Sequence, residues 1–106
     1  MKAYDVYGID APDLDSARDL VEARLGIRLE ARESSYRGGD YYKMRGAGDE
    51  SFILQRNYDP IENEWNEPED EDKAFLLFVE ETDRSAELTA LLTRDGAVVL
   101  IRHDTV

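Results

Sequence analysis

The sequence lacks cysteine altogether, and it holds only one histidine, one tryptophan and three prolines among its 106 residues. Without cysteine there is no disulfide framework, no thiol nucleophile and no thiolate metal site. With one histidine, neither a nucleophile–histidine pair nor a usual zinc ligand set is available unless carboxylates fill most positions. These absences argue against the commonest catalytic and metal-binding chemistries, and we expect no metal and no cofactor.

Long hydrophobic runs are also missing. No stretch approaches the length of a transmembrane helix, and the first residues lack the apolar run of a signal peptide. The composition, 42% hydrophobic and 36% charged, fits a folded chain with a well-solvated surface. We therefore expect one cytoplasmic domain that spans residues 1–106.

Basic side chains are scarce relative to acidic ones. The chain carries 25 acidic and 13 basic residues, which gives a formal net charge of -12. A field of this sign repels nucleic acid and anionic membranes, and it attracts cationic partners. We expect no nucleic-acid or membrane partner.

In the first half, strand and helix patterns alternate. Residues 3–9 have the composition of a strand, and Asp13 is placed to cap a helix that ends at Gly26. The apolar residues of this predicted helix recur at spacings that place them in one stripe on its surface. Three further strands are predicted over residues 27–34, 41–45 and 51–57, joined by turns at Arg37–Asp40 and Gly46–Asp49.

The second half begins with residues 58–72, which contain two prolines and no periodicity and are predicted to form a long loop. Residues 73–80 contain a continuous apolar run, Ala74 to Val79, which predicts a central strand covered on both faces. Asp83 is the expected cap of a second helix that reaches Arg94, and residues 97–102 form the last strand.

This order, β-α-β-β-β-loop-β-α-β, predicts an α+β fold. We expect a single layer of mostly antiparallel sheet with two helices on one face, ferredoxin-like or half-glyoxalase-like. The last two strands should be parallel, either adjacent or separated by one neighbour, because their helical crossover is right-handed.

The predicted loop holds most of the charge imbalance. Eight acids and no base lie between residues 59 and 72, and the other 92 residues hold 17 acids and 13 bases, a net charge of -4. Such a cluster costs stability through repulsion, which argues for a use beyond solubility. The eight are Asp59, Glu62, Glu64, Glu67, Glu69, Asp70, Glu71 and Asp72.

Trp65 lies in the middle of these acids, and Tyr58 lies at their front edge. An aromatic side chain among carboxylates is a plausible anchor for a partner, since the ring supplies buried area and the charges guide docking. Alternatively, Trp65 folds back to cover the edge of its own sheet. A calcium loop is disfavoured because residues 67–72 contain no glycine for the sharp bend.

No catalytic constellation stands out. His103 follows the last predicted strand, where a histidine is more often an exposed side chain than a general base. Pairs of carboxylates suitable for hydrolysis are too numerous to single out any one of them. We therefore expect that the protein is not an enzyme.

Two resemblances add to this interpretation. Residues 4–57, with Asp15–Leu20 leading to Leu25-Gly26 and strands that end in Phe52-Ile53-Leu54, resemble one module of the glyoxalase/bleomycin-resistance superfamily. That family builds its ligand pocket from two such modules. As a small acidic α+β chain with a charged loop, the whole is similar in type to bacterial toxin-immunity proteins of contact-dependent inhibition and other polymorphic toxin systems. This similarity implies binding to a cognate, often basic, toxin domain.

Our first hypothesis is therefore an immunity protein that neutralises a basic, nuclease-type toxin C-terminal domain through its acidic loop. The alternative is a small ligand-binding or enzyme module of glyoxalase-like topology, which requires a homodimer. A third option is a regulatory subunit without a toxin. The expected partner-binding residues are Tyr58, Asp59, Glu62, Glu64, Trp65, Glu67, Glu69 and Asp70.

Overall fold

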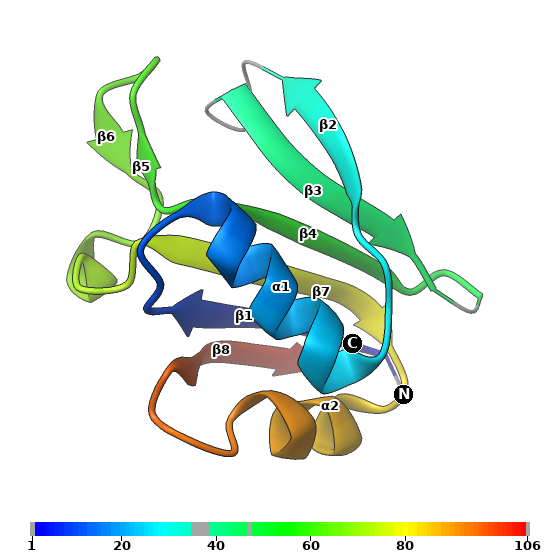
Figure 1. Cartoon of the computed structure of the whole chain (residues 1–106). Helices are drawn as coiled ribbons and strands as arrows, with labels where there is room; N and C mark the ends of the chain where they lie inside the picture. The colour runs from blue at the N-terminus through cyan, green and yellow to red at the C-terminus, as the bar shows by residue number, and fades with distance from the viewer. Residues whose placement is uncertain (1, 35–38, 47, 106) are drawn as a thin grey trace.

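The computed structural model describes residues 2–34, 39–46 and 48–105, and these form an α+β fold, as the sequence predicts (Figure 1). The elements are β1 (Ala3–Ile9), α1 (Leu14–Leu25), β2 (Glu30–Ser34), β3 (Gly39–Arg45), β4 (Ser51–Arg56), β5 (Tyr58–Asp59), β6 (Glu64–Trp65), the 3₁₀ turn η2 (Pro68–Asp70), β7 (Phe75–Thr82), α2 (Ser85–Leu92) and β8 (Val98–Thr105).

The main sheet has six strands in the order β2-β3-β4-β7-β1-β8, and β5 and β6 form a separate two-stranded ladder. Neighbouring strands of the main sheet pair antiparallel throughout. Because β1 is antiparallel to both β7 and β8, these two strands run parallel with β1 between them. The predicted relation of the last two strands is thus confirmed, with the N-terminal strand as the intervening neighbour.

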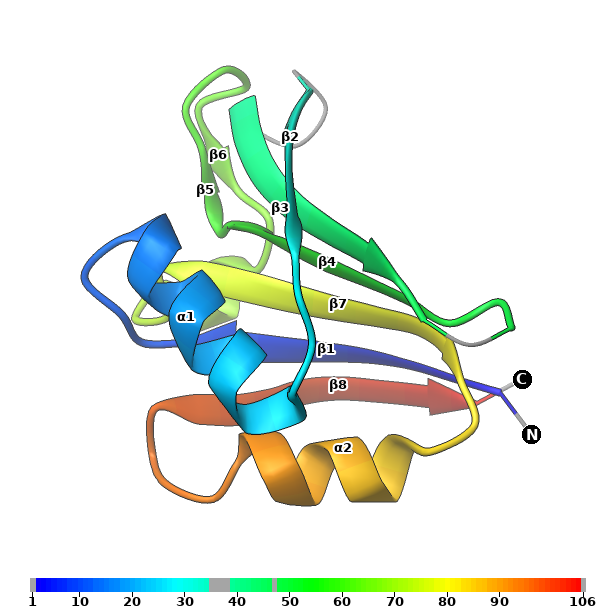
Figure 2. The same ribbon diagram turned by 45° about the vertical axis from the view of Figure 1, so that its right-hand side comes forward.

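Both helices lie on the same face of the sheet, as predicted (Figures 1 and 2). The Asp13 carboxylate accepts a hydrogen bond from the backbone nitrogen of Ser16 at 2.7 Å, and this caps α1. Gly26 ends the helix with φ 67°, a left-handed conformation that glycine adopts without steric cost. The predicted start and end of this helix are therefore confirmed.

The hydrophobic core lies between the sheet and the helices. Alternate residues of β1, β4 and β7 point toward the helices and are fully buried, among them Tyr7, Phe52 and Leu77. Val21 of α1 and Leu88 of α2 meet them from the other layer. This period-two pattern follows from the pleat of the strands.

The strand order confirms the predicted central position of residues 73–80, but in the described part of the chain helices cover only one face of the sheet and not both (Figure 2). Leu76 is nevertheless buried on the other face, opposite Gly8 in the register of β1 and β7. A Cβ atom at Gly8 would come within 2.7 Å of Lys73 Cγ and 2.8 Å of Ile101 Cδ1. The absence of a side chain at Gly8 therefore lets these two neighbours close over the strands.

Several predicted boundaries are corrected. The strand expected over residues 27–34 begins only at Glu30, and its side chains are mostly exposed because β2 is an edge strand. The second helix is shorter than expected, and Arg84 rather than Asp83 occupies its N-terminal cap without a side-chain bond. Of the predicted Arg37–Asp40 turn, residues 37 and 38 lie outside the described residues, as does Ala47 of the next turn.

Candidate functional site

The acidic residues 58–72 form a structured projection, which we call the acidic arm. The predicted unstructured loop is corrected here: β5 and β6 pair through Tyr58 with Trp65 and Asp59 with Glu64, and η2 follows. In Figure 1 the β5–β6 ladder extends beyond one end of the main sheet. Local periodicity could not predict it because each strand has only two residues.

Asn57, immediately before the arm, holds the two ends of the arm together. Its side chain is completely buried. The amide nitrogen donates to the carbonyl oxygens of Glu67, Asp70 and Lys73 at 3.4, 3.0 and 2.9 Å, and the amide oxygen accepts from the backbone nitrogen of Glu67 at 2.8 Å. The Asn57 side chain thus provides hydrogen-bond partners for backbone groups that no neighbouring strand pairs with.

Asp59 shapes the turn of the ladder. Its carboxylate accepts hydrogen bonds from the backbone nitrogens of Ile61 and Glu62 at 2.9 and 3.2 Å, and the residue is buried. Asn63 adopts a left-handed φ of 56°, and the Tyr58 hydroxyl donates to its side-chain oxygen. The carboxylate of Asp59, one of the expected partner-binding residues, therefore stabilises its own turn through hydrogen bonds.

Tyr58 and Trp65 pack edge to face, with ring centroids 5.1 Å apart. They line a cavity of about 360 Å³ at the base of the arm, together with Arg56, Pro60, Ala74 and Phe75. The Arg56 guanidinium is already bound to Asp40 at 2.6 Å. Trp65 is half-buried, so it partly covers its own sheet and also offers an aromatic wall to a partner.

The carboxylates of the arm divide into two groups. Glu67 binds Arg102 of β8 at 2.5 Å, and Asp72 lies 3.3 Å from Lys73. Within the described ranges, the other six form no ion pair: Asp59, whose carboxylate bonds to the backbone of its own turn, and Glu62, Glu64, Glu69, Asp70 and Glu71.

The acidic arm therefore combines unpaired negative charge with apolar surface. Ile61, at the turn between β5 and β6, is 55% exposed, and the Tyr58–Trp65 cavity lies at the other end of the same ladder. Unpaired carboxylates attract a cationic surface, and an apolar cavity accepts a side chain from it. Chemically, an arrangement of this kind can bind a cationic protein surface.

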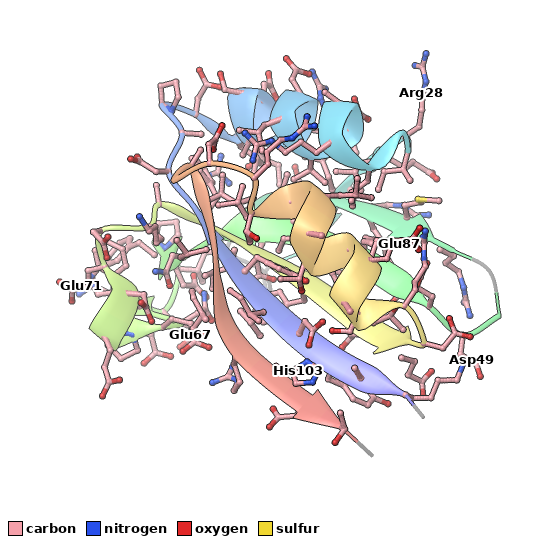
Figure 3. All side chains as sticks on the ribbon, turned by 90° about the horizontal axis from the view of Figure 1, so that it is seen from below. Arg28, Asp49, Glu67, Glu71, Glu87 and His103 are labelled. Carbon is pink, nitrogen blue, oxygen red and sulfur yellow. The ribbon has the colours of Figure 1, made fainter. Side chains whose placement is uncertain are left out.

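A second polar cluster lies beside α2, where the sequence suggested none. Asp5 of β1 has a fully buried side chain, and its carboxylate accepts from His103 Nδ1 and from the Ser85 hydroxyl, each at 2.5 Å. Figure 3 shows His103 beside β1 and β8, away from Glu71 of the acidic arm. His103 is exposed, as expected, but it does not follow the last strand, because β8 extends to Thr105 and pairs His103 with Asp5.

These three residue types occur in serine hydrolases, but their geometry here is different. In a catalytic triad the serine contacts one ring nitrogen of the histidine and the aspartate contacts the other. Here the Ser85 oxygen lies 3.3 Å from Nδ1, the same nitrogen that binds Asp5, and its proton is donated to the carboxylate. Ser85 therefore holds Asp5 in place and is not activated as a nucleophile.

No sequence signal pointed to this cluster. Asp5 and His103 are 98 residues apart, and only the pairing of the first and last strands of the main sheet brings them together. No group of three or more potential metal-ligating side chains occurs in the part of the chain that the structure describes. In the same part, no helix has the length and apolar character needed to cross a membrane.

Comparisons with known proteins add no assignment to this geometry. No family model matches the chain, and neither does any curated protein or any solved structure.

Proposed function

We propose that this protein binds a positively charged protein through its acidic arm, and that it acts as an immunity protein against a basic, nuclease-type toxin domain. The observation that carries the proposal is a set of five carboxylates without an ion pair among the described residues, on a hydrogen-bonded arm with an apolar cavity at its base. The contact residues are Tyr58, Glu62, Glu64, Trp65, Glu69 and Asp70. Asp59 and Glu67 support the arm from within.

Rigidity supports this function physically. A loop that becomes ordered only on binding loses conformational entropy at that step, and its affinity falls accordingly. In this chain the bonds of Asn57 and Asp59 order the arm before any partner arrives. The carboxylates are therefore displayed in a set pattern, which provides selectivity for one arrangement of cationic groups.

Occlusion is the proposed mode of inhibition. The carboxylates of the arm bind the lysine and arginine side chains with which a nuclease holds substrate phosphates, and one apolar or aromatic side chain of the toxin enters the Tyr58–Trp65 cavity. Long-range attraction by the net charge of -12 accelerates capture. The short-range contacts at the cavity slow dissociation.

The charge contribution is tested by reversing Glu62, Glu64 and Glu69 to lysine together. The immobilised protein is used to capture partners from a lysate of its native cell at about 50 and about 500 mM salt, since screening at high salt weakens such attraction. We expect the wild-type chain to retain a basic protein at low salt, and the triple variant to lose it. Growth arrest by that protein should be relieved by co-expression of the wild-type chain and not of the variant.

The matched control reverses Asp10, Asp49 and Glu87 to lysine, which changes the net charge equally at sites outside the arm. If this control still retains the basic protein, the loss seen with the arm variant is due to the position of the reversed charges and not to the change in net charge. A Trp65→Ala variant should weaken binding by about 2 kcal/mol, as is usual for a central aromatic anchor. Equal loss with both triple variants, or capture of a protein that causes no growth arrest, would refute the immunity function.

A further inference from the structure

A cavity of about 650 Å³ is lined by residues of α2, β1 and β8 and by none of the acidic arm. This volume is within the range of small-molecule sites. The walls combine apolar side chains with a few polar groups, which is the usual composition of such sites. Its lining residues include Ala3, Asp83, Ala86, Ala90, Leu100 and His103.

His103 presents one defined atom to a ligand. When the Asp5 carboxylate is ionised it only accepts hydrogen bonds, and its 2.5 Å contact with the ring then places a proton on Nδ1. The other ring nitrogen, Nε2, has no bonding partner among the described residues, and in the neutral ring it is an acceptor. Asp5, itself bound by Ser85, therefore fixes both the tautomer and the direction of the ring.

The charges around this cavity favour a cationic ligand. Asp83 lines the cavity, and it forms no ion pair within the described ranges. No lysine or arginine is among the lining residues. The net charge of -12 adds a field that repels anions and attracts cations.

The apolar wall has room for a hydrocarbon group. Leu100 of the edge strand β8 is 39% exposed, and the small side chains of Ala86 and Ala90 face the same cavity from α2. Burial of these surfaces by a ligand body is favourable in proportion to the apolar area removed from water.

We propose that this cavity is a binding site for a small organic amine, whose ammonium group donates to His103 Nε2 and pairs with Asp83 while its apolar body covers Leu100, Ala86 and Ala90. The site lies within one chain, so it requires neither a homodimer nor the partner of the acidic arm. This ligand class is independent of the proposed inhibition.

The test uses three probes of similar shape and different charge: phenethylamine, 2-phenylethanol and 3-phenylpropionate. Each is titrated into the full-length protein at neutral pH while backbone amide signals are followed by NMR. We expect shifts at Ala86, Ala90, Leu100 and His103 with the amine. The dissociation constant of the alcohol should be about fivefold higher or more, as expected for loss of one charge interaction, and the carboxylate should not bind.

Variants locate the site. Asp83→Asn should raise the dissociation constant of phenethylamine about threefold to fivefold, because one exposed charge contact is lost. Ala90→Phe should abolish binding by filling the cavity. Glu87→Gln is the matched control, since it removes a nearby exposed carboxylate, on α2, at a position outside the lining, and it should leave the dissociation constant unchanged.

His103→Phe should also abolish the preference for the amine over the alcohol, but it leaves the buried Asp5 carboxylate without its histidine partner and risks misfolding. The Asp83 and Ala90 variants keep the proposal testable in that case. Equal binding of all three probes, tighter binding of the carboxylate, or an unchanged affinity in Ala90→Phe would overturn the proposal.

Discussion

A single buried amide, that of Asn57, bonds to several backbone groups of the acidic arm and of the segment after it. Its four hydrogen bonds reach three backbone carbonyls and one backbone nitrogen, all within residues 67–73. Each of these backbone groups would otherwise need water or another partner. Because the residue lies just after β4, its side chain ties the arm to the main sheet.

We expect Asn57→Ala to lower the free energy of unfolding by about 2 to 3 kcal/mol, since several buried polar groups lose their partner at once. Urea unfolding measures this change. Hydrogen exchange should show faster exchange of the Glu67 amide, which bonds to the Asn57 side chain in the wild type. Asn66→Ala is the control, because Asn66 is exposed and its side chain bonds to fewer groups. Equal effects of the two substitutions would contradict this account.

At the scale of elements, Glu50 connects the start of β4 to the start of α2. Its buried carboxylate accepts from the Arg84 guanidinium at 2.8 and 3.0 Å and from the Thr82 hydroxyl at 2.7 Å. The Arg84 bonds lower the pKa of Glu50 despite the opposing effect of burial, and the Thr82 bond lowers it further. Thr82 also accepts from the Arg84 backbone nitrogen at 3.1 Å, which replaces the missing side-chain cap of α2.

This pKa shift predicts how stability depends on pH. A carboxyl group with a lowered pKa in the folded state stabilises the protein above its unfolded-state pKa, and this contribution is lost as the pH falls through the folded-state pKa. We expect Glu50→Gln to lower the free energy of unfolding by about 1 to 2 kcal/mol at pH 7, a value reduced by the partial exposure of Arg84. The difference from wild type should shrink below about pH 4.

Urea midpoints of wild type and Glu50→Gln, measured at pH 7 and at about pH 3.5, give this comparison. Asp10→Asn is the control, because Asp10 is exposed. A deficit in Glu50→Gln that stays constant between the two pH values would exclude the ion pair as its cause.

For the whole molecule, the net charge of -12 opposes compaction. Few of the acids in the arm have a cationic neighbour, so repulsion within the arm adds to the general field. Salt screens this repulsion over distances of about 10 Å at 0.1 M. It also screens the surface ion pairs, but each of those contributes little to stability.

We therefore expect the urea midpoint to rise as sodium chloride increases from about 10 to about 300 mM, a range over which the screening length shortens severalfold. The triple lysine variant of Glu62, Glu64 and Glu69 should show a smaller rise, because it halves the net charge. A midpoint that falls with salt would mean that attractive ion pairs outweigh the repulsion.

Much of the fold was predictable because its determinants are local. The carboxylate of Asp13 and the backbone freedom of Gly26 set the two ends of α1, and apolar alternation set the strands of the main sheet. The acidic arm was also located from composition alone. The ladder inside it was missed because each of its strands has only two residues, and the Asn57 bonds that tie the arm to the sheet leave no local pattern in the sequence.

By itself, the sequence determined the α+β class, the order of the main elements and the place of the excess charge, since capping, periodicity and charge density depend on neighbouring residues. Only the tertiary structure decided that β1 lies between β7 and β8, and therefore that Asp5, Ser85 and His103 meet. It also decided which acids of the arm are paired and which are free. Contacts between residues far apart in the chain follow from how the sheet and helices pack, and no local pattern encodes that packing.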